Sequence, residues 1–318
     1  MSAAMPLDIA AVHAAVDAAH AQSASVGGGA NASYIPYLAS VPATLSGVAV
    51  VTTDGVVVSA GDVRYEFAIE SISKVFTLAL ALEDHGPEAV RAKVGANATG
   101  LPFNSVMALA LHGGRPLSPL VNAGAIATAS LVNGAGAEER WARILDMQGR
   151  MAGRTIALSA DVNQSEQTTN FHNRAIAWLL YSAGTMYSDP MQACDVYTRQ
   201  CSTLITAVDL AVMGATLAAG GVNPLTGKRV LANANVPHIL AEMAMEGLYE
   251  TSGDWAYTVG LPGKSGVGGG VLAVMPGVAA VAGFAPPLDA AGNSVRGQRM
   301  VAEVARRLGW NLYRTPGN

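Results

Sequence analysis

Charged and aromatic side chains are both scarce in this sequence. Asp, Glu, Lys and Arg make up 13% of its 318 residues, and Phe, Trp and Tyr only 6%. The 19 basic residues are scattered among 23 acidic ones, so the formal net charge is -4 and no region builds up a positive field. This balance argues against nucleic acid or an anionic membrane as a partner. A small-molecule partner fits better.

Cysteine is nearly absent, with only Cys194 and Cys201 in the chain. Their spacing of seven places both on one face of a helix, which suits buried thiols better than a disulfide. Asp8 precedes the first apolar positions and no basic residue does, so the layout of a secretory signal is missing. Residues 268–288 carry no charge, but glycines and the pair Pro276-Gly277 interrupt them, which argues against a membrane span. We therefore expect a soluble cytoplasmic protein.

Strand-like segments occur at both ends of the chain and helical ones in the middle. Two β-branched runs flank Asp54-Gly55, a strong hairpin signal, and Pro276-Gly277 separates a second pair of runs. Alanine-rich segments that end in glycine fill the part between. The expected helices are 7–22, 71–82 and 295–308, a loop or lid covers 23–33, and the expected extended segments are 48–52, 56–59, 65–69, 257–259, 271–275 and 278–285.

This pattern predicts an α/β (α+β) fold with an all-α insertion. Residues 1–70 and 223–318 would form one discontinuous sheet domain. Residues 71–222 would form a mostly helical domain.

The first chemical signal is Ser71-Ile72-Ser73-Lys74 at the start of a predicted helix. Ser71 and Lys74 face the same way on a helix, and a serine becomes a nucleophile only beside a base, which a desolvated lysine can be. The helix start adds free N–H groups and partial positive charge. The alternative interpretation is a capping serine followed by a solvated lysine.

A second lysine, one of only four, opens Lys264-Ser265-Gly266 before Val267 and three more glycines. S-x-x-K together with K-T-G is the signature of penicillin-recognising serine enzymes. The glycines would let the backbone approach a substrate, and the N–H groups of Val267 and Ser71 would form an oxyanion hole. The alternative is a glycine-rich turn leading into a hairpin. The third part of that signature, S-x-N or Y-x-N, is missing, which weakens the β-lactam interpretation.

Polar residues embedded in apolar helical segments form a further set: Asn122, Glu166, Asn173 and Tyr197. A free amino acid needs such groups, a carboxylate for its ammonium group and amides or hydroxyls for its carboxylate. Asn122 alone would equally serve as a helix cap. Glu166 and Asn173, seven apart, would share a helix face or flank a helix start.

From about Tyr34 to Gly297 the sequence resembles the bacterial and mitochondrial-type glutaminases. The stretches that carry the resemblance include YIPYLA, FAIESISKVFTLALAL, NAGAI, NRAIAWLL, YTRQCS and GLYETSGDWAYTVGLPGKSGVGGG. The resemblance implies a fold similar to serine β-lactamases and penicillin-binding proteins, with an antiparallel sheet flanked by helices. Departures in TGLPFNS and PLSPLVNAGA touch no position with a chemical role.

The resemblance also implies the site. Ser71 would be the nucleophile, with Lys74 or Tyr249 as its base and the Val267 main chain in the oxyanion hole. The implied substrate-binding residues are Tyr34, Ser71, Asn122, Glu166, Asn173, Tyr197, Tyr249 and Val267. The resemblance implies neither a metal nor a cofactor. It does imply a homo-oligomer, either a dimer or a tetramer.

The implied reaction is hydrolysis of L-glutamine to L-glutamate and ammonia through a glutamyl-serine ester. Two alternatives remain. One is a β-lactamase-like or peptidase-like acyl-serine hydrolase, which penicillin would label. The other is a non-catalytic glutamine-binding protein, which would release no ammonia.

Overall fold

Both ends of the chain contribute to one five-stranded sheet in the computed structural model, which describes residues 7–315. The strand order is β2-β1-β8-β7-β6, and every neighbouring pair is antiparallel. Val50 of β1 lies opposite Val281 of β8, so the N-terminal and C-terminal strands pair directly. The strands are β1 Gly47–Thr52, β2 Val57–Gly61, β6 Gly263–Ser265, β7 Gly270–Met275 and β8 Ala279–Phe284.

Both predicted hairpins are present. Asp54-Gly55 connects β1 to β2 and Pro276-Gly277 connects β7 to β8. Gly55 and Gly277 have φ angles of 88° and 75°, which a glycine adopts without steric cost. Local turn chemistry therefore places the strand ends where the sequence predicts them.

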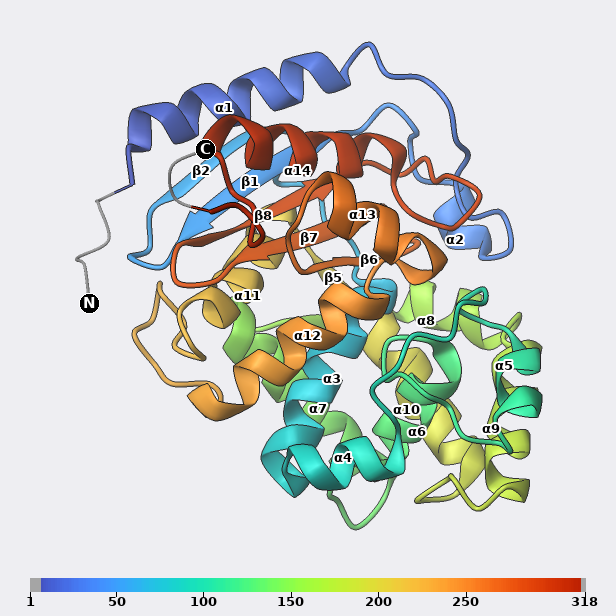
Figure 1. The fold of residues 1–318 in the computed structure, drawn as a ribbon. Coiled ribbons are helices and arrows are strands. Elements are labelled where there is room, and N and C mark those ends of the chain that lie inside the picture. Colours follow the sequence, from blue (N-terminus) through green and yellow to red (C-terminus); the bar gives the residue numbers. More distant parts are fainter. Residues whose placement is uncertain (1–6, 316–318) are drawn as a thin grey trace.

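Helices cover the two faces of the sheet. Figure 1 shows α1 (Ile9–Ser23) and α14 (Val295–Leu308) together on one face, and α11 (Ala207–Ala218) on the other. Along β1, Val48 and Val50 pack in the apolar cluster with α1 and α14, whereas Ala49 and Val51 pack in the cluster with α11. The period-two alternation of a strand thus divides the core into two layers.

Most of the remaining helices form the lower part of the molecule in Figure 1, whereas the two short helices α2 and α13 lie at the level of the sheet. Their bounds are α2 Pro36–Ala39, α3 Ser73–His85, α4 Pro87–Lys93, α5 Val106–Leu111, α6 Asn122–Leu131, α7 Ala137–Ala152, α8 Ala160–Gln167, α9 Phe171–Ser182, α10 Pro190–Cys201, α12 Val236–Glu246 and α13 Ser252–Thr258, with 3₁₀ turns η1 Glu70–Ile72, η2 Asn233–Asn235 and η3 Tyr249–Thr251.

Two expectations about secondary structure are wrong. The middle of the chain is not purely helical, because β4 (Ala157–Leu158) and β5 (Thr203–Ile205) join β3 (Phe67–Ala68) in a small sheet of order β3-β5-β4. Residues 257–259 are not a strand, because Tyr257 lies in α13. Trp255 of that helix is buried and donates its ring N–H to the Leu261 carbonyl, a tertiary contact that outweighs local composition.

The three predicted helices are confirmed as α1, α3 and α14. Cys194 and Cys201 are buried free thiols of α10. In residues 23–33, Ala30 pairs with Leu288 in an isolated antiparallel bridge. The two-domain division with bounds at 70/71 and 222/223 stays a prediction, and α11 of the predicted helical part packs on the sheet. Within residues 7–315, no helix has the length and apolarity that crossing a bilayer requires.

Candidate functional site

Ser71 lies at the floor of a cavity where the sheet part meets the helices. It belongs to η1, directly before α3, and it is 5% exposed. The cavity measures about 600 Å³. Six further residues that the sequence predicts for the site also line it: Tyr34, Asn122, Glu166, Asn173, Tyr197 and Val267.

The glycine-rich segment after β6 lies directly against η1. A Cβ on Gly268 would be 2.1 Å from the Ala68 carbonyl oxygen, and one on Gly266 would be 2.9 Å from that of Ile69. Only glycine permits this approach. The N–H groups of Ser71 and Val267 donate to no other group of residues 7–315, so both are available to a ligand oxygen.

Tyr249 is the direct partner of Ser71. The Ser71 hydroxyl lies close enough to that of Tyr249 to lower the pKa of the phenol, and Tyr249 Oη donates to the Ser265 carbonyl at 3.4 Å. Tyr249 has a φ of 58°, a strained conformation for a non-glycine residue. Burial raises the pKa of Tyr249, while its hydrogen bonds to Ser71 and Ser265 lower it. The phenol is therefore neutral in the free protein.

Lys264 holds Tyr249 from behind. Its Nζ lies 4.2 Å from the centre of the Tyr249 ring and donates to the carbonyls of Gly247 (3.0 Å) and Ser265 (2.6 Å). Burial, followed by the charge of Lys74, lowers the pKa of Lys264 well below its usual value. Lys264 thus fixes the strained tyrosine and does not line the cavity.

Lys74 lies in the first turn of α3 and is 1% exposed. Its Nζ donates to Asn122 Oδ1 at 2.7 Å and to the Leu120 carbonyl at 3.5 Å. The Tyr249 ring centre is 5.8 Å away. Burial lowers the pKa of Lys74 to about 8, so a sizeable fraction is an uncharged amine near neutral pH.

Asn122 connects Lys74 to the cavity wall. Its Oδ1 also accepts from the Tyr197 hydroxyl at 3.2 Å, and its Nδ2 donates to Asn173 Oδ1 at 2.9 Å. Asn122 is the first residue of α6, and its side chain caps no helix. The cap alternative is therefore wrong. Glu166 lies near the end of α8 and Asn173 in the first turn of α9, so the two residues flank the start of α9 and do not share one helix face. This is the second of the two arrangements that the sequence allows.

Sequence reasoning missed Glu70, the residue before Ser71. Glu70 is 3% exposed, lines the cavity and forms a side-chain hydrogen bond with Glu166, and its Oε1 has no partner in residues 7–315. Burial, followed by the charge of Glu166, raises the pKa of Glu70 well above its usual value. Burial raises the pKa of Glu166 to about 7, whereas the hydrogen bond from Glu70 lowers it. The two carboxyls thus share one proton, which Glu70 holds.

The mouth of the cavity carries further unpredicted residues. Phe103, Asn104 and His172 line it, and His172 Nε2 lies 2.6 Å from the Asn104 carbonyl oxygen. Tyr34 is 56% exposed, as expected for a residue at the entrance. A signal for Glu70 was present in the sequence, since a charged residue within the apolar run FAIESI is unusual.

Comparison with known proteins gives a consistent result. Residues 29–313 match the family model described as Glutaminase. The chain is 72% identical over 309 residues to the glutaminase of Bordetella avium (strain 197N), covering 97% of this chain and 99% of the relative. It is 69% identical over 308 residues to glutaminase 1 of Escherichia coli (strain K12), with the same coverage of 97% and 99%.

Solved structures agree in fold. A structure described as a probable glutaminase superposes with a TM-score of 0.96 at 69% identity, covering 97% of this chain and 100% of that one. The probable glutaminase of Bacillus subtilis gives 0.85 at 28% identity, covering 94% and 96%. Mglu in its glutamate form gives 0.88 at 35% identity, covering 94% of this chain and 69% of that one.

Proposed function

The chain belongs to the glutaminase family, and we propose that it hydrolyses the side-chain amide of L-glutamine to L-glutamate and ammonia through an ester on Ser71. One observation carries the mechanism. Ser71 lies next to Tyr249, whose pKa its hydroxyl lowers, and it lines a cavity beside two backbone N–H groups that have no partner within residues 7–315. A nucleophile, a proton acceptor and an oxyanion site are thus adjacent.

Acylation begins as Ser71 Oγ attacks the amide carbon. Its proton passes to Tyr249, which transfers its own proton toward the neutral amine of Lys74. We route the proton through Tyr249, and not directly from Ser71 to Lys74, because Tyr249 is the neighbour of the Ser71 hydroxyl. The Lys74 amine forms its hydrogen bonds with Asn122 and Leu120. The oxyanion accepts from the N–H groups of Ser71 and Val267, each worth on the order of 3 kcal/mol in the barrier.

The tetrahedral intermediate then collapses with rupture of the C–N bond. The leaving nitrogen takes the proton back through Tyr249 and departs as ammonia, leaving the glutamyl ester on Ser71. Water attacks the ester carbon, gives its proton along the same path and releases glutamate, which restores the serine hydroxyl.

Recognition of the free amino acid rests on the other cavity residues. The carboxyl pair Glu70–Glu166 carries one negative charge for the α-ammonium group, and a buried charge requires such a partner. Asn173, Tyr197 and Tyr34 line the same cavity, and we assign them to the α-carboxylate. The structural relative Mglu, solved in a glutamate form, supports an amino-acid ligand in this fold.

Two rival functions have less support. The cavity residues Asn122, Asn173 and Tyr197 form a closed hydrogen-bond network that suits an amino acid better than a bulky β-lactam. A binding protein with an idle serine would not need the strained Tyr249 against Ser71. The cytoplasmic location expected from the sequence and the dimer or tetramer implied by the family resemblance remain proposals.

The direct test compares two serine variants. Ser71→Ala should abolish ammonia release and still bind glutamine in calorimetry. Ser73→Ala is the matched control, because Ser73 is equally buried yet does not line the cavity, and it should retain turnover. Undiminished ammonia release by Ser71→Ala would refute the nucleophile.

A further inference from the structure

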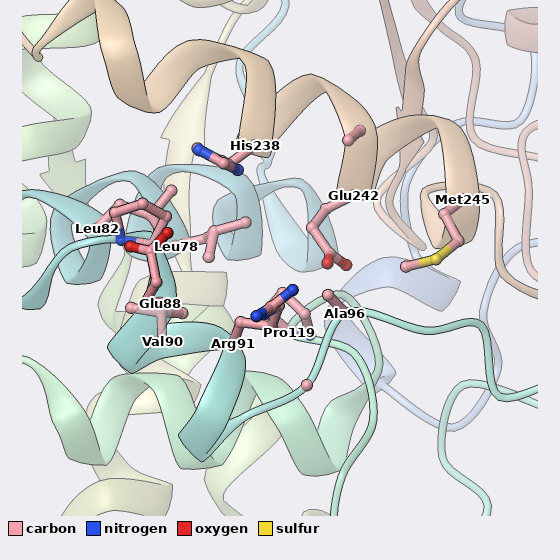
Figure 2. Close-up of a pocket in the computed structure, with 13 residues that line it drawn as sticks. Leu78, Leu82, Glu88, Val90, Arg91, Ala96, Pro119, His238, Glu242 and Met245 are labelled. Carbon is pink, nitrogen blue, oxygen red and sulfur yellow. The ribbon is translucent and has the colours of Figure 1, made fainter.

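A second cavity lies behind the first, on the far side of α3. It measures about 690 Å³ and is bounded by α3, α4, α12 and the segment around Pro119. Figure 2 shows Glu242 pointing into it from α12 and Arg91 pointing into it from the opposite wall. None of its lining residues belongs to the first cavity.

Two ionisable side chains of these walls, Glu242 and Arg91, form no ion pair within residues 7–315. Glu242 is 7% exposed, and its carboxyl accepts from the Ser118 hydroxyl at 3.2 Å. Burial, the largest cause, together with the charge of Glu246 raises the pKa of Glu242 to about 8, although the hydrogen bond from Ser118 lowers it. Arg91 is an exposed residue, and its guanidinium has neither an ion pair nor a hydrogen bond within the described residues 7–315, so it is free to bind a ligand carboxylate. Exposed Glu88 and His238 lie at the rim.

Apolar side chains line the cavity between Glu242 and Arg91. Leu78 and Leu82 of α3 and Val90 of α4 form the floor, and Pro119 and Met245 close the sides. A ligand that complements Glu242, Arg91 and the apolar lining has an ammonium group, a carboxylate and a short branched apolar body.

We propose that this cavity is a regulatory site for a small aliphatic α-amino acid, bound with its ammonium group on Glu242 and its carboxylate on Arg91. The site is separate from the catalytic cavity, and it goes beyond the proposed reaction. An arriving ammonium group stabilises the ionised form of Glu242, so the acid gives up its proton to solvent.

Two walls of the second cavity, the segment around Pro119 and α12, connect to the catalytic residues. Ser118 Oγ donates to Glu242 and accepts from the Leu120 N–H at 3.1 Å, and the Leu120 carbonyl accepts from Lys74. Ionised Glu242 strengthens the hydrogen bond from Ser118. It thereby holds in place the segment of Leu120 and Asn122, which carries the acceptors of Lys74.

The second connection runs through α12. This helix carries Glu242 and ends at Glu246, directly before Gly247, whose carbonyl accepts from Lys264 under the Tyr249 ring. A ligand that braces α12 therefore also braces Tyr249. Occupancy of the second cavity should raise kcat/KM, roughly fivefold for a modest coupling between sites.

The test uses L-leucine and its two half-molecules, 3-methylbutylamine and 4-methylpentanoate. Binding is measured by calorimetry on Ser71→Ala in saturating glutamate, which blocks the first cavity and makes the result independent of turnover. We expect one leucine per chain, proton release near neutral pH in buffers of different ionisation enthalpy, and at least roughly tenfold weaker binding of either half-molecule.

Arg91→Ala and Glu242→Gln should each remove leucine binding in that background. Arg64→Ala is the matched control, since Arg64 is exposed and lies outside the second cavity, and it should bind normally. In the otherwise unaltered enzyme, leucine should raise kcat/KM, and Arg91→Ala should remove only that increase.

Absence of leucine binding would overturn the proposal. So would binding that survives both variants, binding of one half-molecule as tight as that of leucine, or binding without any change in turnover. Failure of the proposed reaction gives a different result: the chain would release no ammonia, but the Ser71→Ala protein would still bind leucine in calorimetry.

Discussion

Replacing Glu70 by glutamine should widen the alkaline range of activity. Glu70 holds the proton that it shares with Glu166, and its pKa is raised, so Glu70 is neutral at low pH and ionises as the pH rises. Ionisation places a second negative charge beside Ser71, where the oxyanion forms. Activity should therefore fall as the pH rises through the pKa of Glu70, and Glu70→Gln should lack that fall.

The size of the effect follows from Coulomb's law. Two unit charges roughly 6 Å apart at an effective dielectric constant near 20 repel by about 3 kcal/mol, which corresponds to about 100-fold in rate. Glutamine keeps a hydrogen-bond donor for Glu166, so the charge alone is removed. The ionisable groups coupled to Glu70 are Glu166, Lys74, Tyr34, Tyr197, Tyr249 and Cys201.

The assay is kcat/KM for ammonia release from about pH 5 to the alkaline limit at which both proteins remain folded, plotted as the ratio of Glu70→Gln to the unaltered enzyme. The ratio cancels groups that titrate in both proteins. We expect it to climb with pH toward roughly 100. A flat ratio over the whole range would refute the shared proton.

Three further variants test the site and its support. Tyr249→Phe should lower kcat on the order of 100-fold or more with KM changed only a few-fold, and an unchanged kcat in the ammonia assay would contradict the relay. A Cβ at Gly124 would lie 1.7 Å from a backbone oxygen, so Gly124→Ala should lower the free energy of unfolding by about 3 kcal/mol. The control is Gly253→Ala, which has open space around it and should raise the free energy of unfolding by up to ~1 kcal/mol. Equal denaturant midpoints for the two variants would argue against this packing. Burial raises the pKa of Asp209, but the hydrogen bonds from Arg154 and Thr206 and the charge of Arg154 together outweigh it, so the net pKa is lowered. The carboxylate therefore stabilises the fold above its ordinary pKa, and that contribution is lost as the pH falls through the lowered value. Asp209→Asn should cost about 1–2 kcal/mol at neutral pH after screening, and a difference in melting temperature that does not shrink in acid would count against it.

Sequence patterns locate most of the cavity because its residues are chemically unusual where they stand. Asn122 begins the apolar helical run NAGAIA, and it lies at the cavity together with Glu166 and Tyr197. The pairing of Glu70 with Glu166 could not be predicted, since it depends on how α8 packs against η1. Nor could the conformation of Tyr249, whose positive φ is imposed by tertiary contacts.

The fold shows the same division. Both hairpins follow from turn residues next to β-branched runs, which act locally. Strands β4 and β5 span only two and three residues, so no periodicity reveals them, and their pairing with β3 joins distant parts of the chain. Residues 257–259 look like a strand in composition, but burial of Trp255 makes the segment helical.

The central claim is that Ser71 carries the glutamyl group during turnover. Acid quenching of the enzyme in saturating glutamine, followed by proteolysis and mass spectrometry, should show one glutamyl addition on the peptide that contains Ser71. The same addition should be missing from Ser71→Ala and should disappear from the unaltered enzyme as glutamine is exhausted. Turnover with no acylated peptide at any quench time, or acylation at another residue, would contradict the account.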